Sequence, residues 1–139
     1  MPVANCGFTG HPGQLIDTGP ELQVELTNPW APDGRPRSCK ALLDTGANHC
    51  FVSGRVADDL RLEQFDTEDF RGAGGRFASP RYLVHLQIPQ LATRASVLLA
   101  RLPDADQIGR SALLGRDFLQ FYRLVYDGPT GDVTLHVSN

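Results

Sequence analysis

The stretch Ala41-Leu42-Leu43-Asp44-Thr45-Gly46-Ala47 decides the fold that we predict for this chain. Its apolar half predicts a strand, and that strand delivers one carboxylate into a tight turn. Glycine at position 46 allows a backbone shape that a side chain would obstruct, and the Thr45 hydroxyl can lock the turn by hydrogen bonding. An aspartate at the end of an apolar run is unusual on structural grounds, because a buried charge is costly unless it is paired.

The same tripeptide occurs earlier as Asp17-Thr18-Gly19, so these three residues alone indicate little. Pro20 follows this first copy, and we interpret it as a hairpin turn between a strand at residues 15–16 and a strand at residues 22–26. In the second of these strands apolar and polar residues alternate, which is the period of a half-buried strand. The sequence therefore favours Asp44 as the residue with a chemical role.

Two further motifs follow along the chain. Residues 71–77 are rich in glycine, which predicts the tip of a hairpin. Ala112-Leu113-Leu114-Gly115 predicts the end of a buried strand, and a short helix is expected over residues 117–122.

Together these motifs resemble the retroviral-type aspartic proteases, or retropepsins, and their bacterial relatives. The shared pattern is a D-T-G-A turn after apolar residues, a glycine-rich flap hairpin, and two apolar residues before Gly-Arg at the start of the C-terminal helix. The resemblance covers residues 22–135, and the hairpin predicted over residues 126–135 is more similar to bacterial and cellular members. It implies a mostly β fold, an acid-protease barrel or folded sheet with one or two short helices, that is active as a homodimer.

The resemblance also implies roles for individual residues in an aspartic endopeptidase. The catalytic turn consists of Asp44, Thr45 and Gly46. The residues implied in substrate binding are Ala47, Asn48, Gly72, Ala73, Gly74, Gly75 and Leu113. Structural support for the turn comes from Leu114, Gly115 and Arg116. We expect no metal ion and no cofactor.

The chemistry explains why a second copy is needed. A single carboxylate cannot both activate water and protonate a carbonyl oxygen, whereas two carboxylates within ~3 Å share one proton and divide these tasks. One chain supplies one good candidate, Asp44. We therefore expect a symmetric homodimer in which Asp44 faces Asp44 of the partner subunit, with an extended peptide or protein as substrate.

One alternative stays open, and a second is disfavoured by the residues themselves. Asn48 stands where many retroviral members have an aspartate that pairs with the arginine of the Gly-Arg segment, and it could only hydrogen-bond to Arg116. This departure leaves room for a catalytically weak or inactive module of the same fold that dimerises or binds peptides. His49-Cys50 suggests a thiol nucleophile with a base, but adjacent strand residues point to opposite faces, so we interpret Cys50 as a small buried apolar residue.

The length of 139 residues predicts one domain, which we place at residues 14–139. An N-terminal segment at residues 1–13, which can be flexible, precedes it. Ser53 is expected to cap a short helix that runs to residue 60. Residues 63–70 are acidic and poorly periodic, and we interpret their charged part as a solvated face. Strands are predicted over residues 39–43, 50–52, 82–88, 95–102, 124–126 and 133–137.

Composition excludes several classes of function. The net charge is −3, so the basic footprint of a nucleic-acid-binding protein is absent. We expect no membrane span, because no run of ~18 apolar residues occurs, and the first residues do not have the pattern of a secretory signal. The three cysteines, Cys6, Cys39 and Cys50, lack the number and spacing of a disulfide framework or zinc site, which favours a cytoplasmic location.

Overall fold

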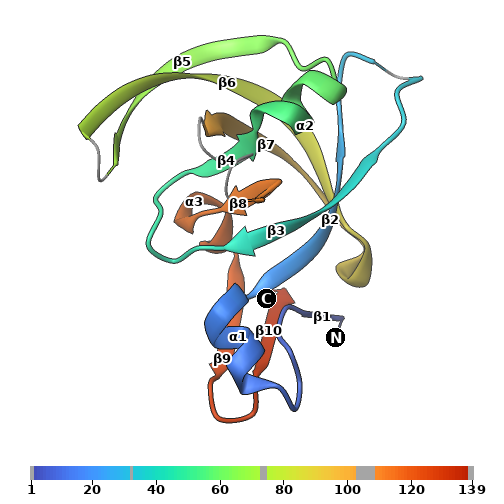
Figure 1. Ribbon diagram of the computed structural model, residues 1–139. Helices are drawn as coiled ribbons and strands as arrows, with labels where there is room; N and C mark the ends of the chain where they lie inside the picture. Colours follow the sequence, from blue (N-terminus) through green and yellow to red (C-terminus); the bar gives the residue numbers. More distant parts are fainter. Residues whose placement is uncertain (1, 32, 73–74, 103–108, 138–139) are drawn as a thin grey trace.

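The computed structural model describes residues 2–31, 33–72, 75–102 and 109–137, and β-strands dominate them (Figure 1). A seven-stranded sheet contains most of the chain. Its strands are β2 (Glu21–Thr27), β3 (Arg37–Leu43), β4 (Cys50–Ser53), β5 (Gln64–Gly72), β6 (Gly75–Ile88), β7 (Thr93–Leu102) and β8 (Ala112–Leu114). The mostly β fold predicted from the sequence is confirmed.

The large sheet closes on itself. Its strand order is β2-β3-β8-β4-β7-β6-β5, and β2 also pairs with β6, where Leu26 lies opposite Leu86. Six strands therefore form a closed ring, while β5 pairs with the outer part of β6. In Figure 1 the β5–β6 hairpin reaches away from the ring as a long two-stranded arm.

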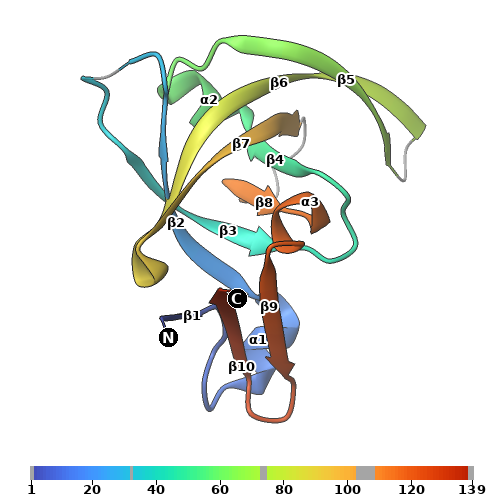
Figure 2. The ribbon, with the colours of Figure 1, turned by 180° about the vertical axis from the view of Figure 1, so that it is seen from behind.

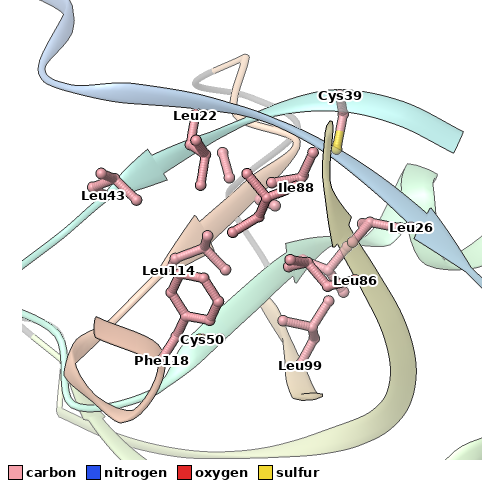
Figure 3. Close-up of a cluster of buried hydrophobic side chains, with 14 of the residues drawn as sticks. Leu22, Leu26, Cys39, Leu43, Cys50, Leu86, Ile88, Leu99, Leu114 and Phe118 are labelled. Atoms are coloured by element: carbon pink, nitrogen blue, oxygen red, sulfur yellow. The ribbon is translucent and has the colours of Figure 1, made fainter. Parts of the chain in front are cut away.

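The ring encloses much of one hydrophobic core, part of which is drawn in Figure 3. Buried residues alternate along β2, so that Leu22, Val24 and Leu26 are all inaccessible to solvent. The predicted core face of β6 is confirmed as well. Its members are Tyr82, Val84, Leu86 and Ile88. Full burial of such a side chain stabilises a fold by about 1.5–3 kcal/mol, so this alternation fixes which face of each strand points inward.

Strand β8 lies between β3 and β4. It runs parallel to β3, with Leu114 opposite Leu43, and antiparallel to β4, with Leu113 opposite Phe51. The short helix α3 (Arg116–Leu119) follows β8 after one residue. This insertion brings the turn after β3 next to the start of α3.

A second, three-stranded sheet lies below the ring. Its order is β1 (Val3–Asn5), β10 (Asp132–Val137) and β9 (Tyr122–Asp127), and the two views in Figures 1 and 2 place helix α1 (Pro12–Thr18) over one of its faces. The hairpin of β9 and β10 matches the closing hairpin expected from the sequence. Because β1 pairs with β10, part of the N-terminal segment packs with the domain, while the boundary at residue 14 stays a prediction.

The strand predicted at residues 15–16 is wrong, because these residues belong to α1. Pro12 begins this helix, where its missing N–H costs nothing, and Leu15 is buried while Ile16 is 79% exposed. Two adjacent apolar residues do not define a period, so the sequence could not distinguish a helix from a strand here. The chain consequently has three α-helices in its described part, one more than expected.

Most of residues 63–70 form β5, a strand that the sequence did not predict. Their poor periodicity concealed this strand, which forms because the long β6 offers a partner edge. Arg81 on β6 donates two hydrogen bonds, of 2.7 and 2.5 Å, to the carboxylate of Asp66 on β5. The acidic stretch is therefore partly paired rather than wholly solvated.

The other helix predictions hold with small shifts. Helix α2 (Gly54–Asp59) begins as expected after Ser53, whose hydroxyl accepts a hydrogen bond of 3.2 Å from the Val56 N–H. Helix α3 ends three residues before the predicted limit, and Tyr122 already begins β9. A single 3-10 turn, η1 (Pro89–Leu91), joins β6 to β7. None of the helices in the described ranges has both the length and the apolar character needed to cross a membrane.

Candidate active site

Asp44 is the first residue after β3, at the point where the buried strand leaves the ring. Its backbone N–H donates to the Leu114 carbonyl at 2.9 Å, which continues the pairing between β3 and β8 by one residue. Asp44 itself is half-buried, and Thr45 and Gly46 are exposed. The ring thus anchors the backbone of Asp44 while its side chain lies at the boundary with solvent.

The turn that follows is held by Asp44 itself. Its carboxylate Oδ1 accepts a hydrogen bond of 2.8 Å from the Gly46 N–H, and its carbonyl accepts one of 3.2 Å from the Ala47 N–H. Within the described residues, Asp44 makes no ion pair. The hydrogen bond from the Gly46 N–H therefore fixes the orientation of the Asp44 carboxylate.

Gly115 and Arg116 support the turn from the other side. The Arg116 N–H donates to the Ala47 carbonyl at 2.8 Å, and its Nη1 donates to the Thr45 carbonyl at 2.6 Å. A Cβ at position 115 would lie 2.3 Å from the His49 carbonyl oxygen, so only glycine fits there. The sequence left the partner of the Arg116 side chain open, and in the structure this partner is the Thr45 backbone carbonyl.

The structure brings together most residues that the sequence assigned to the site. Ala47 and Asn48 complete the turn, the first half-buried and the second exposed. Leu113 is half-buried in β8, whereas Leu114 is fully buried in the core. The β5–β6 hairpin contacts this region through aromatic side chains.

The glycine-rich segment forms the end of the β5–β6 hairpin, as predicted. Gly72 and Gly75 are directly opposite each other in the register of the two strands. Ala73 and Gly74 lie outside the described residues.

Sequence reasoning missed an aromatic cluster that joins the hairpin to the turn. Phe70 on β5 is only 5% exposed and contacts three rings, with centroid distances of 5.1 Å to His49, 5.2 Å to Phe51 and 5.6 Å to Phe77. Edge and tilted contacts of this kind are worth about 0.5–1.5 kcal/mol beyond burial. One indication was available, because Phe70-Arg71-Gly72 and Gly75-Arg76-Phe77 mirror each other as the arms of a hairpin would.

Cys50 does not have the environment of a nucleophile. It is 2% exposed, and its thiol donates to Asp117 Oδ1 at 3.0 Å. Burial, followed by this hydrogen bond, raises the pKa of the Cys50 thiol far above its ordinary value, so the thiol stays protonated. The sequence interpretation of Cys50 as a buried residue is confirmed.

Asp117 is a second residue that the sequence did not single out. Its Oδ1 accepts from the Phe118 N–H at 2.8 Å as well as from Cys50, and its Oδ2 lies 3.9 Å from His49 Nδ1. It therefore connects the first turn of α3 with the start of β4. Among the described side chains, no group of three or more histidine, cysteine or acidic residues is placed to hold a metal ion.

Comparison with known proteins adds the family context. A family profile described as aspartyl protease matches residues 32–118, which include the turn, the hairpin and the Gly115-Arg116 pair. A search of curated proteins by sequence gave no match.

Three solved structures are similar in fold. A retropepsin-like aspartic protease from Rickettsia conorii has a TM-score of 0.59 at 14% identity, over 97% of this chain and 92% of that one. The EIAV protease in complex with the inhibitor HBY-793 has a TM-score of 0.52 at 21% identity, over 73% of this chain and 85% of that one. The simian foamy virus (mac) protease has a TM-score of 0.50 at 15% identity, over 73% and 92%. At these identities the likeness concerns the fold, and the fold expected from the sequence is confirmed.

Proposed function

Because the chain belongs to the aspartyl protease family, we propose that it is an endopeptidase that hydrolyses extended peptides as a symmetric homodimer. The observation that carries the proposal is the placement of Asp44, at the end of a buried strand and in a turn braced by Gly46 and Arg116. Each chain contributes one such carboxylate, so two copies are needed to assemble a dyad.

The proposed chemistry divides the two tasks between the copies. The ionised carboxylate takes a proton from a bound water, whose oxygen attacks the carbonyl carbon of the scissile amide. The protonated carboxylate, from Asp44 of the partner subunit, donates its proton to the carbonyl oxygen. Collapse of the tetrahedral intermediate breaks the C–N bond: one carboxylic acid of the dyad protonates the leaving amine, and one hydroxyl group of the intermediate returns its proton to the other carboxylate. The titration belongs to the pair, so cleavage should decline at both ends of an acidic-to-neutral pH range.

The β5–β6 hairpin is the proposed flap that closes over the substrate. Its contact with the body through Phe70, beside His49 and Phe51, supports this role because the hairpin is anchored on the residues that follow the turn. A peptide held between hairpin and turn would bind as an added strand, with main-chain hydrogen bonds for affinity and alternating pockets for specificity.

The open position of Asp44 supports a site that needs a second copy. A pocket of about 490 Å³ lies between α3, β6 and β7, with Leu83, Val97 and Phe118 among its apolar lining residues. Asp44 is not part of its lining.

We also propose a cytoplasmic location, which the three buried cysteines without disulfides support.

A comparison of two substitutions tests the proposal. We expect Asp44→Asn to keep the fold but to lower cleavage of a mixed peptide library by at least ~10²-fold, since general acid–base catalysis contributes this much. Asp17→Asn is the matched control and should cleave like the wild type. Products are quantified by mass spectrometry across acidic to neutral pH, and circular dichroism checks folding.

Three outcomes would contradict the proposal in different ways. Full activity in Asp44→Asn would remove Asp44 from the mechanism. Loss of activity in Asp17→Asn alone would move the site to the first copy of the tripeptide. Peptide binding without cleavage at any pH would identify the chain as a binding module of the same fold.

A further inference from the structure

The pocket between α3, β6 and β7 has the size and lining of a small-molecule site. Its volume is about 490 Å³, and sites for small ligands occupy about 300–1,000 Å³ with mostly apolar walls and a few convergent polar groups. The apolar walls here include Leu83, Val97, Phe118 and Phe121. Because Asp44 does not line this pocket, the pocket is separate from the proposed catalytic turn.

One wall of the pocket is an unpaired strand edge. Strand β4 pairs with β7 only along residues 99–102, and no other described strand pairs with that side of β7. Residues 95–98, which line the pocket, therefore present backbone groups on an edge without a strand partner. Such an edge offers N–H and C=O groups to an incoming molecule, so the pocket has polar as well as apolar contacts to offer.

Negative charge is in excess around the pocket. Arg81, on its lining, donates hydrogen bonds of 2.7 and 2.5 Å to the Asp66 carboxylate and lies 3.7 Å from Glu68. The carboxylates of Asp66, Glu68 and Asp117 all raise the pKa of Arg81, Asp66 most and Asp117 least. One guanidinium group therefore stands against three carboxylates, and its charge is already matched by the two on β5.

Asp117 presents one oxygen atom to a ligand. Its Oδ1 accepts hydrogen bonds from the Cys50 thiol at 3.0 Å and from the Phe118 N–H at 2.8 Å. Its Oδ2 lies 3.9 Å from His49 Nδ1, which is too far for a hydrogen bond. Within the described ranges, Oδ2 therefore accepts no hydrogen bond, and at 39% exposure the Asp117 side chain is open to a ligand.

We propose that this pocket binds a small organic cation, an ammonium group carried on a flat apolar body. The ammonium group donates to Asp117 Oδ2, and the apolar body packs between β7 and the rings of Phe118 and Phe121. Aromatic faces also attract a cation that lies within about 6 Å. An anionic ligand of the same shape would meet the excess of negative charge, and a neutral one would gain only the apolar contacts.

Three probes of one shape and different charge test the proposal. Phenethylamine is the cation, phenethyl alcohol is the neutral analogue, and phenylacetate is the anion. Titration of the nitrogen-15-labelled chain, followed by amide chemical shifts, gives each dissociation constant and locates the site. We expect the amine to bind about three- to tenfold more tightly than the alcohol, because its ion pair is partly exposed to solvent, and phenylacetate to bind most weakly. The shifts should lie at residues 95–98 and in α3.

Two variants separate the charge from the apolar wall. Asp117→Asn keeps an Oδ1 acceptor for Cys50 and Phe118, so the fold should persist while the affinity for the amine falls to that for the alcohol. Phe121→Ala removes a ring that is 65% exposed, and it should weaken all three probes by a similar factor, about two- to fivefold. Asp33→Asn and Phe65→Ala, which change exposed residues outside the pocket lining, are the matched controls and should bind like the wild type.

The outcomes that overturn the proposal are distinct. Amine and alcohol that bind the wild type equally would remove the role of the charge, and tighter binding of phenylacetate would reverse its sign. Shifts confined to another surface, or no shift at millimolar probe, would remove the site. If Asp117→Asn does not fold, the comparison of probes on the wild type and on Phe121→Ala still decides. Since Asp44 does not line the pocket, none of these results depends on whether the chain cleaves peptides.

Discussion

The same tripeptide occurs at two places in this molecule and has a different local role in each. Asp17-Thr18-Gly19 ends helix α1, where the Gly19 N–H donates to the Leu15 carbonyl at 2.8 Å and so closes the last turn. Asp44-Thr45-Gly46 follows strand β3, where the Gly46 N–H donates to the Asp44 carboxylate at 2.8 Å. One glycine N–H completes a helix, while the other orients a side chain.

In both tripeptides an arginine donates a hydrogen bond to the threonine carbonyl, so this contact does not distinguish them. Arg116 donates to the Thr45 carbonyl at 2.6 Å, and Arg110 donates to the Thr18 carbonyl at 2.7 Å. The difference lies in what precedes each aspartate. Asp44 continues the pairing of a buried strand with β8, whereas Asp17 is exposed on a short helix. The strand that delivers the carboxylate, rather than the tripeptide, makes Asp44 the candidate.

Substituting the glycine of each copy should separate activity from stability. In Gly46→Ala the new Cβ would lie 3.1 Å from Asp44 Oδ1, so we expect the carboxylate to shift and cleavage to fall by about tenfold or more, with little change in stability. In Gly19→Ala the backbone has φ +79° and ψ 170°, a region that is nearly restricted to glycine, and the cost is about 1–3 kcal/mol of unfolding free energy. Urea unfolding and kcat/KM measure the two effects.

Gly13→Ala is the control for this pair, because nothing lies within 4 Å of the added Cβ. It should leave cleavage unchanged. Equal losses of cleavage per folded molecule in Gly19→Ala and Gly46→Ala would mean that the two copies do not differ in function.

Substituting the two arginines should give a smaller effect and tests the same difference between the two tripeptides. Arg116→Gln and Arg110→Gln each remove a charge-assisted hydrogen bond to a carbonyl, and each should cost about 0.5–1.5 kcal/mol of unfolding free energy. Only Arg116→Gln should also lower kcat, since only the Thr45 carbonyl lies in the proposed catalytic turn. A drop in kcat with Arg110→Gln alone would contradict this assignment, and thermal unfolding checks that both variants are equally folded.

The sequence was sufficient where local pattern determines structure. Alternation predicted β2 and the core half of β6, and Ser53 predicted the start of α2, because periodicity and capping act within a few residues. The motifs also placed the turn, the hairpin and β8 in the correct order. The catalytic and binding roles of these residues stay predictions.

The remaining features depend on contacts between distant segments. Strand β5 forms on the edge of β6, and β1 forms on the edge of β10, so neither has a pattern of its own. The packing of Phe70 on His49 and Phe51 joins segments about twenty residues apart in the chain. Asp117 acquires its partners only when α3 lies against β4. Such pairings depend on how distant segments come together in the fold, which the sequence indicated only through resemblance.

The smallest effect concerns pH and the β5–β6 hairpin, which contacts His49 just after the Asp44 tripeptide. The hydrogen bonds from Arg81 hold the pKa of Asp66 below its usual value. A carboxylate whose pKa is lower in the folded state stabilises the fold above its unfolded pKa, and this contribution is lost as the pH falls through the folded value. We therefore expect the hairpin to loosen below about pH 4, while α1 with the Asp17 copy stays unchanged.

Hydrogen exchange with mass spectrometry locates this response. In the wild type, peptides from β5 should exchange faster on acidification, after correction for the intrinsic rate, and peptides from α1 should not. Asp66→Asn should show the faster exchange of β5 already at neutral pH and a smaller acid response there, since Arg81 still lies 3.7 Å from Glu68. The effect is small, because Asp66 and its partner lie near the surface and salt screens them. An acid response in α1 as large as that in β5 would show that protonation acts on the whole fold, and the contrast between the two regions would then not extend to pH.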